Sequence, residues 1–343
     1  SVSPEPVNTF TVGFDEKEFD ESPYANMIAK KFNTRHTAIK LRPESFLEEL
    51  VPALCAMDTP SGDGVNSYVV SRAIRQSGLT VALSGVGGDE LFAGYPIFKQ
   101  YLQLSKWKNW WKISRWPRHL LAALLSNKSS KQQRYKQLLR APACNIAWFY
   151  PVFRQILPPP MIADCTRLAA NDVTGIRELL LSKMDALEKL PPLSQVSVAD
   201  FLGYTQHTLL KDMDQMSMAV SLEVREPFFD HELIEFVLCV PDRIKYPHYP
   251  KQLLVETLGD LLPAEIVHRK KQGFLFPWSI WMKQELRSFC EEHLQKIAQR
   301  DFINRNNLLQ YWNRFLQNDQ TIRWTEIWLF VVLEHWLEQN GVE

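Results

Sequence analysis

A predicted strand followed by a glycine-rich turn constrains this chain more than any other stretch. The apolar run Val81–Leu83 leads into Ser84 and Gly85, two more glycines follow at positions 87 and 88, and helical apolar spacing begins after Asp89. Glycines at the end of a buried strand let a ligand approach the backbone, a helix start offers N–H groups to an anion, and Asp89 suits Mg²⁺ on a polyphosphate. An ordinary strand–helix connection with an acidic helix cap explains the same residues equally well.

Strand and helix patterns alternate upstream of this turn. The strand patterns lie at residues 8–14 and 36–41, and the helical ones at residues 21–32, 43–54 and 68–74. This alternation predicts a parallel sheet covered by helices, with ligands at the carboxyl ends of the strands. Beyond Tyr95 the spacing is mostly helical. We therefore expect an α/β lobe over residues 1–100 and a helical part over residues 101–343.

The helical part has its own pattern of breaks. Prolines between positions 142 and 160 predict a loop-rich passage, whereas residues 176–190 and 194–218 have helical spacing. Apolar residues around Trp328 recur at the spacing of a helix packed into a core.

The charge is balanced overall but uneven along the chain. Its 343 residues include 39 Lys and Arg and 39 Asp and Glu, which argues against a general nucleic-acid binder. No acidic residue lies between Glu90 and Asp164. Twelve basic residues fall in that interval: Lys99, Lys106, Lys108, Lys112, Arg115, Arg118, Lys128, Lys131, Arg134, Lys136, Arg140 and Arg154.

Tryptophans at positions 107, 110, 111 and 116 accompany these basic residues. Such a mixture suits a membrane surface or an acidic partner. We favour an amphipathic helix over residues 102–125, with its tryptophans toward the core and a solvated basic face.

Cysteine usage and the absence of targeting signals predict a cytoplasmic protein. The five cysteines are odd in number and scattered, without Cys-x-x-Cys spacing, which is typical of a reducing compartment. No apolar run approaches the length of a transmembrane helix, and the first residues do not form a signal peptide.

Three segments resemble the asparagine synthetase family. Residues 81–95 resemble its second signature, residues 214–231 a further block, and Lys251 precedes a third match at residues 262–274. The resemblance covers nearly the whole chain. It implies an adenine nucleotide alpha hydrolase-like fold of the PP-loop ATP pyrophosphatase type, with a parallel sheet, helices and a mostly helical carboxyl-terminal part.

The resemblance also implies a chemistry. In the family a carboxylate attacks the α-phosphorus of ATP, pyrophosphate leaves, and an amine displaces AMP from the acyl-adenylate. Asp89 would hold Mg²⁺, and Lys251 would neutralise the α-phosphate and the departing pyrophosphate. Ser84 and Gly85 would contact the nucleotide, and Val12 would contact the adenine or ribose unless it is simply a buried strand residue.

Further positions follow from the resemblance with alternatives open. Glu223 and Arg225 fall where the family places acceptor and active-site polar groups, although an ion pair bridging two helices is an equally good interpretation. Lys271 would add positive charge near the nucleotide. Asp63 lies in the loop where many relatives carry an acidic residue near the substrate.

The chain departs from the family pattern in two places. Relatives have a Ser-Gly-Gly-x-Asp-Ser pyrophosphate loop just upstream of the strand that here begins near Asn8, and glutamine-dependent members have a glutaminase domain before it. We therefore expect this chain to be a fragment with half an ATP site. Val86 stands where relatives have an acidic residue or a tyrosine, and valine cannot relay a proton.

The expected function is that of the synthetase part of an amidotransferase. ATP and Mg²⁺ would activate a carboxylate, most simply that of aspartate, and ammonia from glutamine would form the amide. Amidation of a polysaccharide sugar, closure of a β-lactam and cyclisation of a peptide are alternatives, as is a non-catalytic paralogue that acts as a binding partner. A homodimer is possible.

Overall fold

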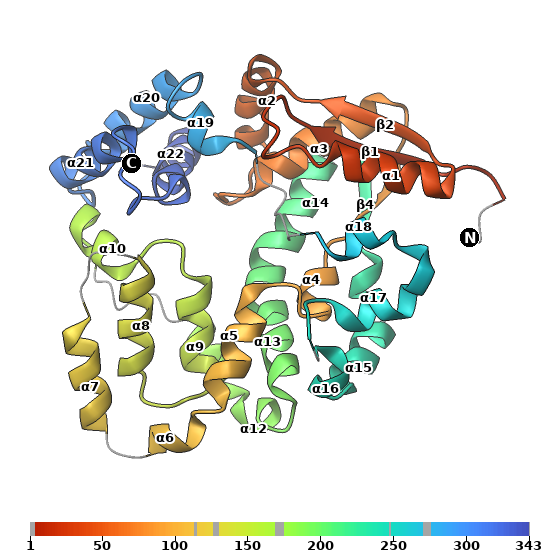
Figure 1. Cartoon of the computed structure of the whole chain (residues 1–343). Coiled ribbons are helices and arrows are strands. Elements are labelled where there is room, and N and C mark those ends of the chain that lie inside the picture. Colours follow the sequence, from red (N-terminus) through yellow and green to blue (C-terminus); the bar gives the residue numbers. More distant parts are fainter. Residues whose placement is uncertain are drawn as a thin grey trace.

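The computed structural model describes residues 4–112, 115–125, 130–168, 175–246, 248–269 and 276–342. A column of helix formed by α13 (Pro192–Asp200), the π-helical segment η1 (Phe201–Leu209) and α14 (Leu210–Met218) runs through the middle of the molecule (Figure 1). The helix predicted over residues 194–218 is confirmed. It continues from residue 192 to residue 218 and changes to π-helical hydrogen bonding in its middle third.

The first strands and helices form as predicted. Strand β1 (Asn8–Gly13) pairs in parallel with β2 (Arg35–Lys40), and α1 (Ser22–Phe32) connects them. Helices α2 (Pro43–Cys55) and α3 (Gly64–Gln76) follow. Both α1 and α2 carry a proline in their first turn, where its missing N–H removes no helical hydrogen bond.

The single predicted sheet is wrong for the described part of the chain, which has two separate pairs of parallel strands. Strand β3 (Val81–Leu83) pairs with β4 (Glu223–Arg225), which was not predicted. The alternation of strands and helices along a sequence does not specify which strands pair. In addition, β4 has only three residues, which is too short for a recognisable period of two.

The middle of the chain is helical, and two predictions are wrong here. The single helix expected over residues 102–125 is instead α5, α6 and α7, and the passage expected to be loop-rich contains α9 and α10. Pro151 lies inside α9, and α10 begins with prolines in its first turn, so neither prevents helix formation. The bounds are α4 (Gly88–Leu91), α5 (Pro96–Ser105), α6 (Lys108–Lys112), α7 (Arg115–Leu124), α8 (Ser130–Arg140), α9 (Ile146–Arg154), α10 (Pro159–Cys165), α11 (Gly175–Ser182) and α12 (Met184–Leu187).

The helices after β4 lie on two sides of the central column (Figure 1). Helices α15 (His231–Cys239) and α17 (Gln252–Leu258) pack near α4, α18 (Ala264–Val267) lies beside α1, and the last four helices pack against the first strands and helices. Their bounds are η2 (Pro227–Phe229), α15 (His231–Cys239), α16 (Asp242–Lys245), α17 (Gln252–Leu258), η3 (Gly259–Leu261), α18 (Ala264–Val267), α19 (Trp278–Trp281), α20 (Arg287–Ile297), α21 (Arg305–Leu316) and α22 (Trp324–Gln339).

Two large hydrophobic cores hold these elements together. The first joins β1 and α2 to the last helices, and Phe46, Trp278 and Trp328 are almost fully buried in it. The packing role predicted for Trp328 is confirmed. The second core lies among α5, α9 and α13, around Phe98 and Phe149. In the part of the chain that is described, no helix is long and apolar enough to cross a membrane.

Candidate functional site

The glycine-rich turn after β3 has the open backbone that the sequence predicted. The Ser84 N–H donates to the Arg225 carbonyl at 2.9 Å, which continues the pairing with β4, and the Val86 N–H donates to Ser84 Oγ at 3.2 Å. Gly87 has a φ of +96°, and a Cβ there would lie 3.0 Å from two phenylalanine side chains. A Cβ on Gly85 would meet no atom within 4 Å, so this backbone faces open space. The turn therefore offers a ligand exposed peptide groups.

Asp89 and Lys251 meet beside this turn. Lys251 Nζ lies 2.9 Å from Asp89 Oδ1, and both side chains are partly exposed. Asp89 lies in the single turn of α4, whereas Lys251 precedes α17 in the left-handed backbone region and donates its N–H to the Phe92 carbonyl at 3.1 Å. Two residues predicted from distant motifs are thus brought into contact.

Gly94 packs closely against this ion pair. A Cβ at position 94 would lie 1.8 Å from Asp89 Oδ1 and 2.6 Å from Lys251 Cε. Real Cβ contacts are never that short, so a side chain here would displace the pair.

The helix that follows this turn is shorter than the sequence predicted. The helix expected after it is only four residues long in α4, so its macrodipole is small. The positive charge beside the turn is that of Lys251.

The surroundings of Asp89 limit the kind of Mg²⁺ site that is possible here. The described residues contain no group of three or more His, Cys, Asp and Glu side chains that could hold a metal ion. A site that relies on substrate phosphates needs only one or two protein carboxylates, because Mg²⁺ retains waters and takes phosphate oxygens. The partly exposed carboxylate of Asp89 fits that kind of site and does not fit a metal site built from protein ligands alone.

Glu223 and Arg225 form the expected ion pair, but it lies within one strand, so the expectation that it bridges two helices is wrong. They are two positions apart on β4, so both side chains lie on the same face of the strand. Arg225 Nε lies 2.7 Å from Glu223 Oε1. Both are more than half exposed, so the pair contributes at most about 1 kcal/mol to stability. Since Arg225 is opposite Leu83, the pair lies next to the start of the glycine-rich turn.

A buried ion pair behind the turn was missed by the sequence reasoning. Arg154 donates to both carboxylate oxygens of Asp200, at 2.8 and 2.6 Å, and Asp200 is fully buried. The guanidinium lies between two aromatic rings, 4.6 Å from the centre of Tyr95 and 4.4 Å from that of Tyr204. This arrangement joins α9, the end of α13 and η1.

Each of the two tyrosines donates to a carboxylate. The Tyr95 hydroxyl donates to Glu90 Oε1 at 2.7 Å, and the Tyr204 hydroxyl donates to Asp63 Oδ2 at 3.3 Å. Burial raises the pKa of both Glu90 and Asp63. Because Glu90 follows Asp89, the network connects the Asp89–Lys251 pair to the beginning of α3 through Arg154.

The π-helical segment η1 contributes a tyrosine to this network and also holds a buried threonine. Tyr204 belongs to η1, and π-helical turns are frequent at functional sites. The buried hydroxyl of Thr205, also in η1, has no hydrogen-bond partner among the described residues. Farther along the column, Asp212 accepts from Ser61 at 2.5 Å, and burial raises the pKa of Asp212 to about 6.

Comparison with known proteins agrees with this geometry. The model of the asparagine synthase family matches residues 1–338 of the chain. The chain belongs to the asparagine synthase family. The match includes the turn, Asp89 and Lys251.

Relatives in this family have several names. A Bacillus subtilis asparagine synthetase (glutamine-hydrolyzing) is 26% identical, over 97% of this chain and 52% of the relative. A putative asparagine synthetase from Mycobacterium bovis is 28% identical over 80% of this chain and 42% of the relative. A Penicillium rubens protein named amidase chyE is 24% identical over 81% of this chain and 44% of the relative. The chain thus spans about half the length of these relatives.

One further predicted nucleotide contact of this asparagine synthase family member, Val12, is not assembled with the others. Val12 lies in β1, which does not pair with β3, and its side chain is 4% exposed. Lys271 lies outside the described residues.

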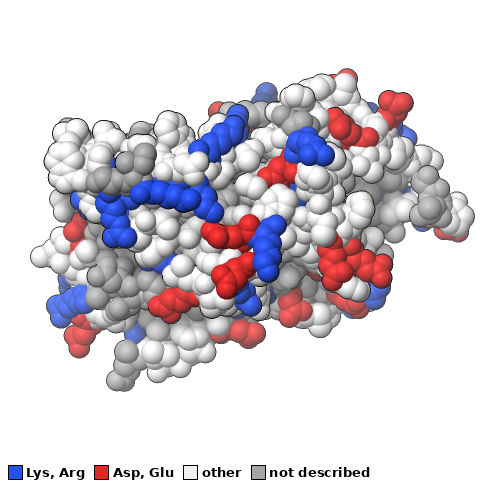
Figure 2. All heavy atoms as spheres, turned by 90° about the horizontal axis from the view of Figure 1, so that it is seen from below, with Lys and Arg blue, Asp and Glu red and all other residues white. Residues whose placement is uncertain are grey.

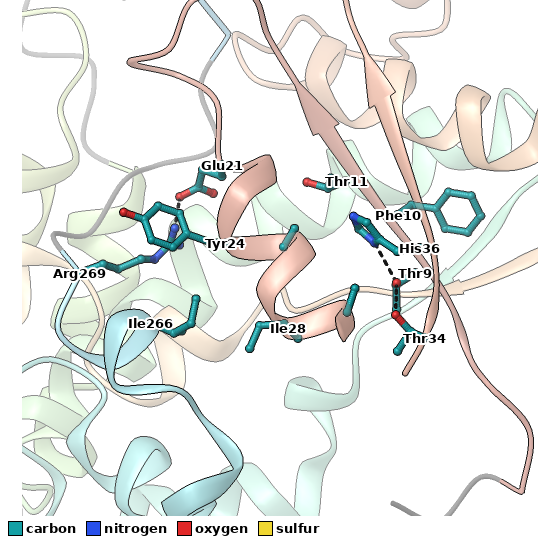
Figure 3. Close-up of a pocket in the computed structure, with 12 residues that line it drawn as sticks. Thr9, Phe10, Thr11, Glu21, Tyr24, Ile28, Thr34, His36, Ile266 and Arg269 are labelled. Carbon is teal, nitrogen blue, oxygen red and sulfur yellow. Dashed lines mark hydrogen bonds and ion pairs between the residues drawn. The ribbon is translucent and has the colours of Figure 1, made fainter. Parts of the chain in front are cut away.

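A separate cavity of about 340 Å³ lies between β1, β2 and α1 (Figure 3). At one end Arg269 pairs with Glu21 at 2.7 Å and lies over the Tyr24 ring, and at the other His36 Nδ1 lies 2.9 Å from Thr9 Oγ1. None of the predicted site residues lines this cavity. The candidate site is consequently the turn with the Asp89–Lys251 pair.

Proposed function

We propose that this chain is the synthetase part of a glutamine-dependent amidotransferase that activates a carboxylate with ATP. The observation that supports this most strongly is the contact of Lys251 Nζ with Asp89 Oδ1 beside the open glycine-rich turn. A carboxylate for Mg²⁺ and an ammonium group for phosphate are the two charges that adenylation requires. The names of the glutamine-hydrolyzing relatives support the same reaction class.

In the first half-reaction, an oxygen of the substrate carboxylate forms a bond to the α-phosphorus, the bond to the bridging oxygen breaks, and pyrophosphate leaves. Lys251 would lie against the α-phosphate and the departing pyrophosphate. The exposed backbone at Ser84 and Gly85 would position the nucleotide. Bound Mg²⁺ would neutralise charge on the phosphate oxygens, and Asp89 would hold it.

In the second half-reaction, ammonia attacks the acyl carbon, AMP leaves with the oxygen of the broken acyl bond, and the surplus proton goes to solvent. We propose that the ammonia comes from a glutaminase domain of the same protein. We also propose that a Ser-Gly-Gly-x-Asp-Ser loop elsewhere in that protein supplies the remaining N–H groups for pyrophosphate. The greater length of the relatives is compatible with both.

The names of the relatives and the residue at position 86 bear on the identity of the acceptor. Aspartate is the simplest acceptor, because most of the named relatives are asparagine synthetases. Val86 lacks the acid–base group expected at its position, which favours a different acceptor such as a sugar acid or the carboxylate of a peptide or β-lactam precursor. The same valine is compatible with a non-catalytic paralogue.

Carboxylate-dependent exchange between ATP and pyrophosphate tests the proposal. The full-length protein should catalyse exchange with aspartate or one of the other carboxylates, and Lys251→Ala should abolish it. Lys40→Ala is a matched control, since Lys40 pairs with Asp15 on an exposed surface away from the turn. Absence of exchange with every carboxylate would leave the non-catalytic paralogue as the better account.

A further inference from the structure

Helix α7 exposes its apolar residues, contrary to the prediction that the tryptophans of this region face the core. We define the α7 apolar face as Trp116, Leu120, Leu121 and Leu124. Trp116 is 72% and Leu124 76% exposed, and the two leucines between them are about half exposed. Trp111 of α6 is buried as predicted, but Trp107 is also exposed.

Arg118 explains why α7 turns its apolar face outward. Its Nη1 donates to the carbonyls of Leu139 and Ala141, at 3.2 and 2.9 Å, and its guanidinium lies 4.8 Å above the centre of the Trp111 ring. Arg118 and Ala122, which are one helical turn apart, form the buried side of α7. The residues of the α7 apolar face lie on the other side of the helix, so fixing Arg118 in the interior exposes them.

An exposed apolar stripe of this kind is costly in water unless something covers it. Large contiguous apolar patches on soluble proteins mark interaction sites more often than chance, whereas single exposed leucines do not. Here three leucines and one tryptophan share one face of a ten-residue helix. Because Arg118 occupies the buried side of α7, the packing of the protein itself fixes the outward orientation of these four residues.

The charges around α7 indicate the nature of the partner. Lys106, Lys112 and Arg115 are exposed on and beside α6 and α7, and the sequence has no acidic residue from Leu91 to Ala163. Lys108 is compensated by Glu188 of another segment, at 3.0 Å. Figure 2 views the molecule from below, and its left part shows Lys and Arg side chains among uncharged surface and a few Asp and Glu side chains.

We propose that the α7 apolar face and its basic neighbours bind the surface of a membrane that contains anionic lipids. Leucines and tryptophan on one side of a helix enter the boundary between headgroups and acyl chains, while lysine and arginine attract anionic headgroups. A nucleic acid satisfies only the charges and leaves the leucines in water. In Figure 1 α7 lies at the lower left, away from α4 and α17, so binding there leaves the candidate site accessible.

Co-sedimentation of the full-length protein with vesicles tests this proposal and does not depend on catalysis. Vesicles of phosphatidylcholine with phosphatidylglycerol should bind the protein, and binding should weaken with salt and with phosphatidylcholine alone. The double variant Trp116→Ser, Leu124→Ser should partition at least about tenfold less, because two membrane-inserted apolar side chains are lost. Phe236→Ser is the matched control, since Phe236 is 69% exposed on α15, outside the basic region.

Three results would overturn the proposal. The first is a failure of the wild-type protein to bind anionic vesicles. The second is a loss of binding in the Phe236→Ser control as large as that in the double variant. In the third, size-exclusion chromatography without lipid shows that the double variant dissociates a wild-type oligomer, which would assign the α7 apolar face to a contact between copies. Circular dichroism of each variant verifies that it is folded.

Discussion

Two pairs of opposite charges lie near α4 and differ in the burial of their carboxylate and in the number of their hydrogen bonds. Asp89 and Lys251 form a single contact of 2.9 Å, with both side chains partly exposed. Arg154, whose side chain is 22% exposed, donates two hydrogen bonds to the fully buried Asp200, and its guanidinium lies over two tyrosine rings. A partly exposed pair can exchange each partner for a ligand of the same charge, whereas a buried bidentate pair cannot separate without leaving a charge unsolvated. We therefore assign ligand binding to the first pair and positioning of α4 to the second.

The largest expected effect is on activity at the exposed pair. Asp89→Asn should lower Mg²⁺-dependent ATP–pyrophosphate exchange about a thousandfold or more, because the carboxylate proposed to hold the metal is lost. Its stability should change by less than about 1 kcal/mol. Asp15→Asn, which breaks an exposed pair with Lys40, should leave exchange unchanged. Normal exchange by Asp89→Asn would remove Asp89 from the mechanism.

At the Arg154–Asp200 pair the expected effect is on stability. Asp200→Asn leaves the Arg154 guanidinium without its counter-ion and should lower the free energy of unfolding by about 3–5 kcal/mol. Urea denaturation of the variant and the wild type measures this difference. A loss below about 1 kcal/mol would mean that water or another carboxylate reaches Arg154, and the comparison between the two pairs would fail.

Asp212 provides a pH-dependent test of burial in the same column of helix. Burial raises the pKa of Asp212 from 3.8 to about 6, so the folded state binds the proton more tightly than the unfolded state does. Stability from this group is therefore full below pH 4 and is lost as the pH rises through 6, by up to about 3 kcal/mol. Asp212→Asn cannot ionise. Relative to this variant, the wild type should lose stability between pH 4 and 7 in urea titrations, and equal pH profiles would contradict the assignment.

The smallest expected effect comes from displacing the exposed pair without changing its charges. Gly94→Ala puts a methyl group where Asp89 Oδ1 and Lys251 Cε lie, so both groups must move. Exchange should fall by about 10- to 100-fold, since misplacement by about an ångström costs that much. Gly85→Ala is the control, because its Cβ would meet no protein atom within 4 Å. Equal exchange in both variants would show that the position of the pair does not matter.

Features set by local sequence were predictable. The turn after Val81–Leu83, the proline-started helix α2 and the buried Trp328 each follow from patterns within a few residues. The contact between Asp89 and Lys251 was predictable only through the family resemblance, because 162 positions separate them in the sequence.

Contacts between segments that are far apart in the sequence were not predictable. Arg154 lies in the passage predicted to be loop-rich and Asp200 in a helical pattern. Neither belongs to a motif, and only the packing of α9 against α13 brings them together. Likewise, the spacing of Trp116 indicates an amphipathic helix but not which side faces the core. That side was decided by the carbonyls that accept from Arg118.

Calorimetric titration of the full-length protein with ATP, in Mg²⁺ and in EDTA, tests the central claim most directly. If Asp89 holds the metal and Lys251 the phosphate, Lys251→Ala should weaken ATP binding in both conditions, whereas Asp89→Asn should weaken it only with Mg²⁺. Equal weakening by Asp89→Asn in Mg²⁺ and in EDTA, or unchanged binding by Lys251→Ala, would contradict these roles.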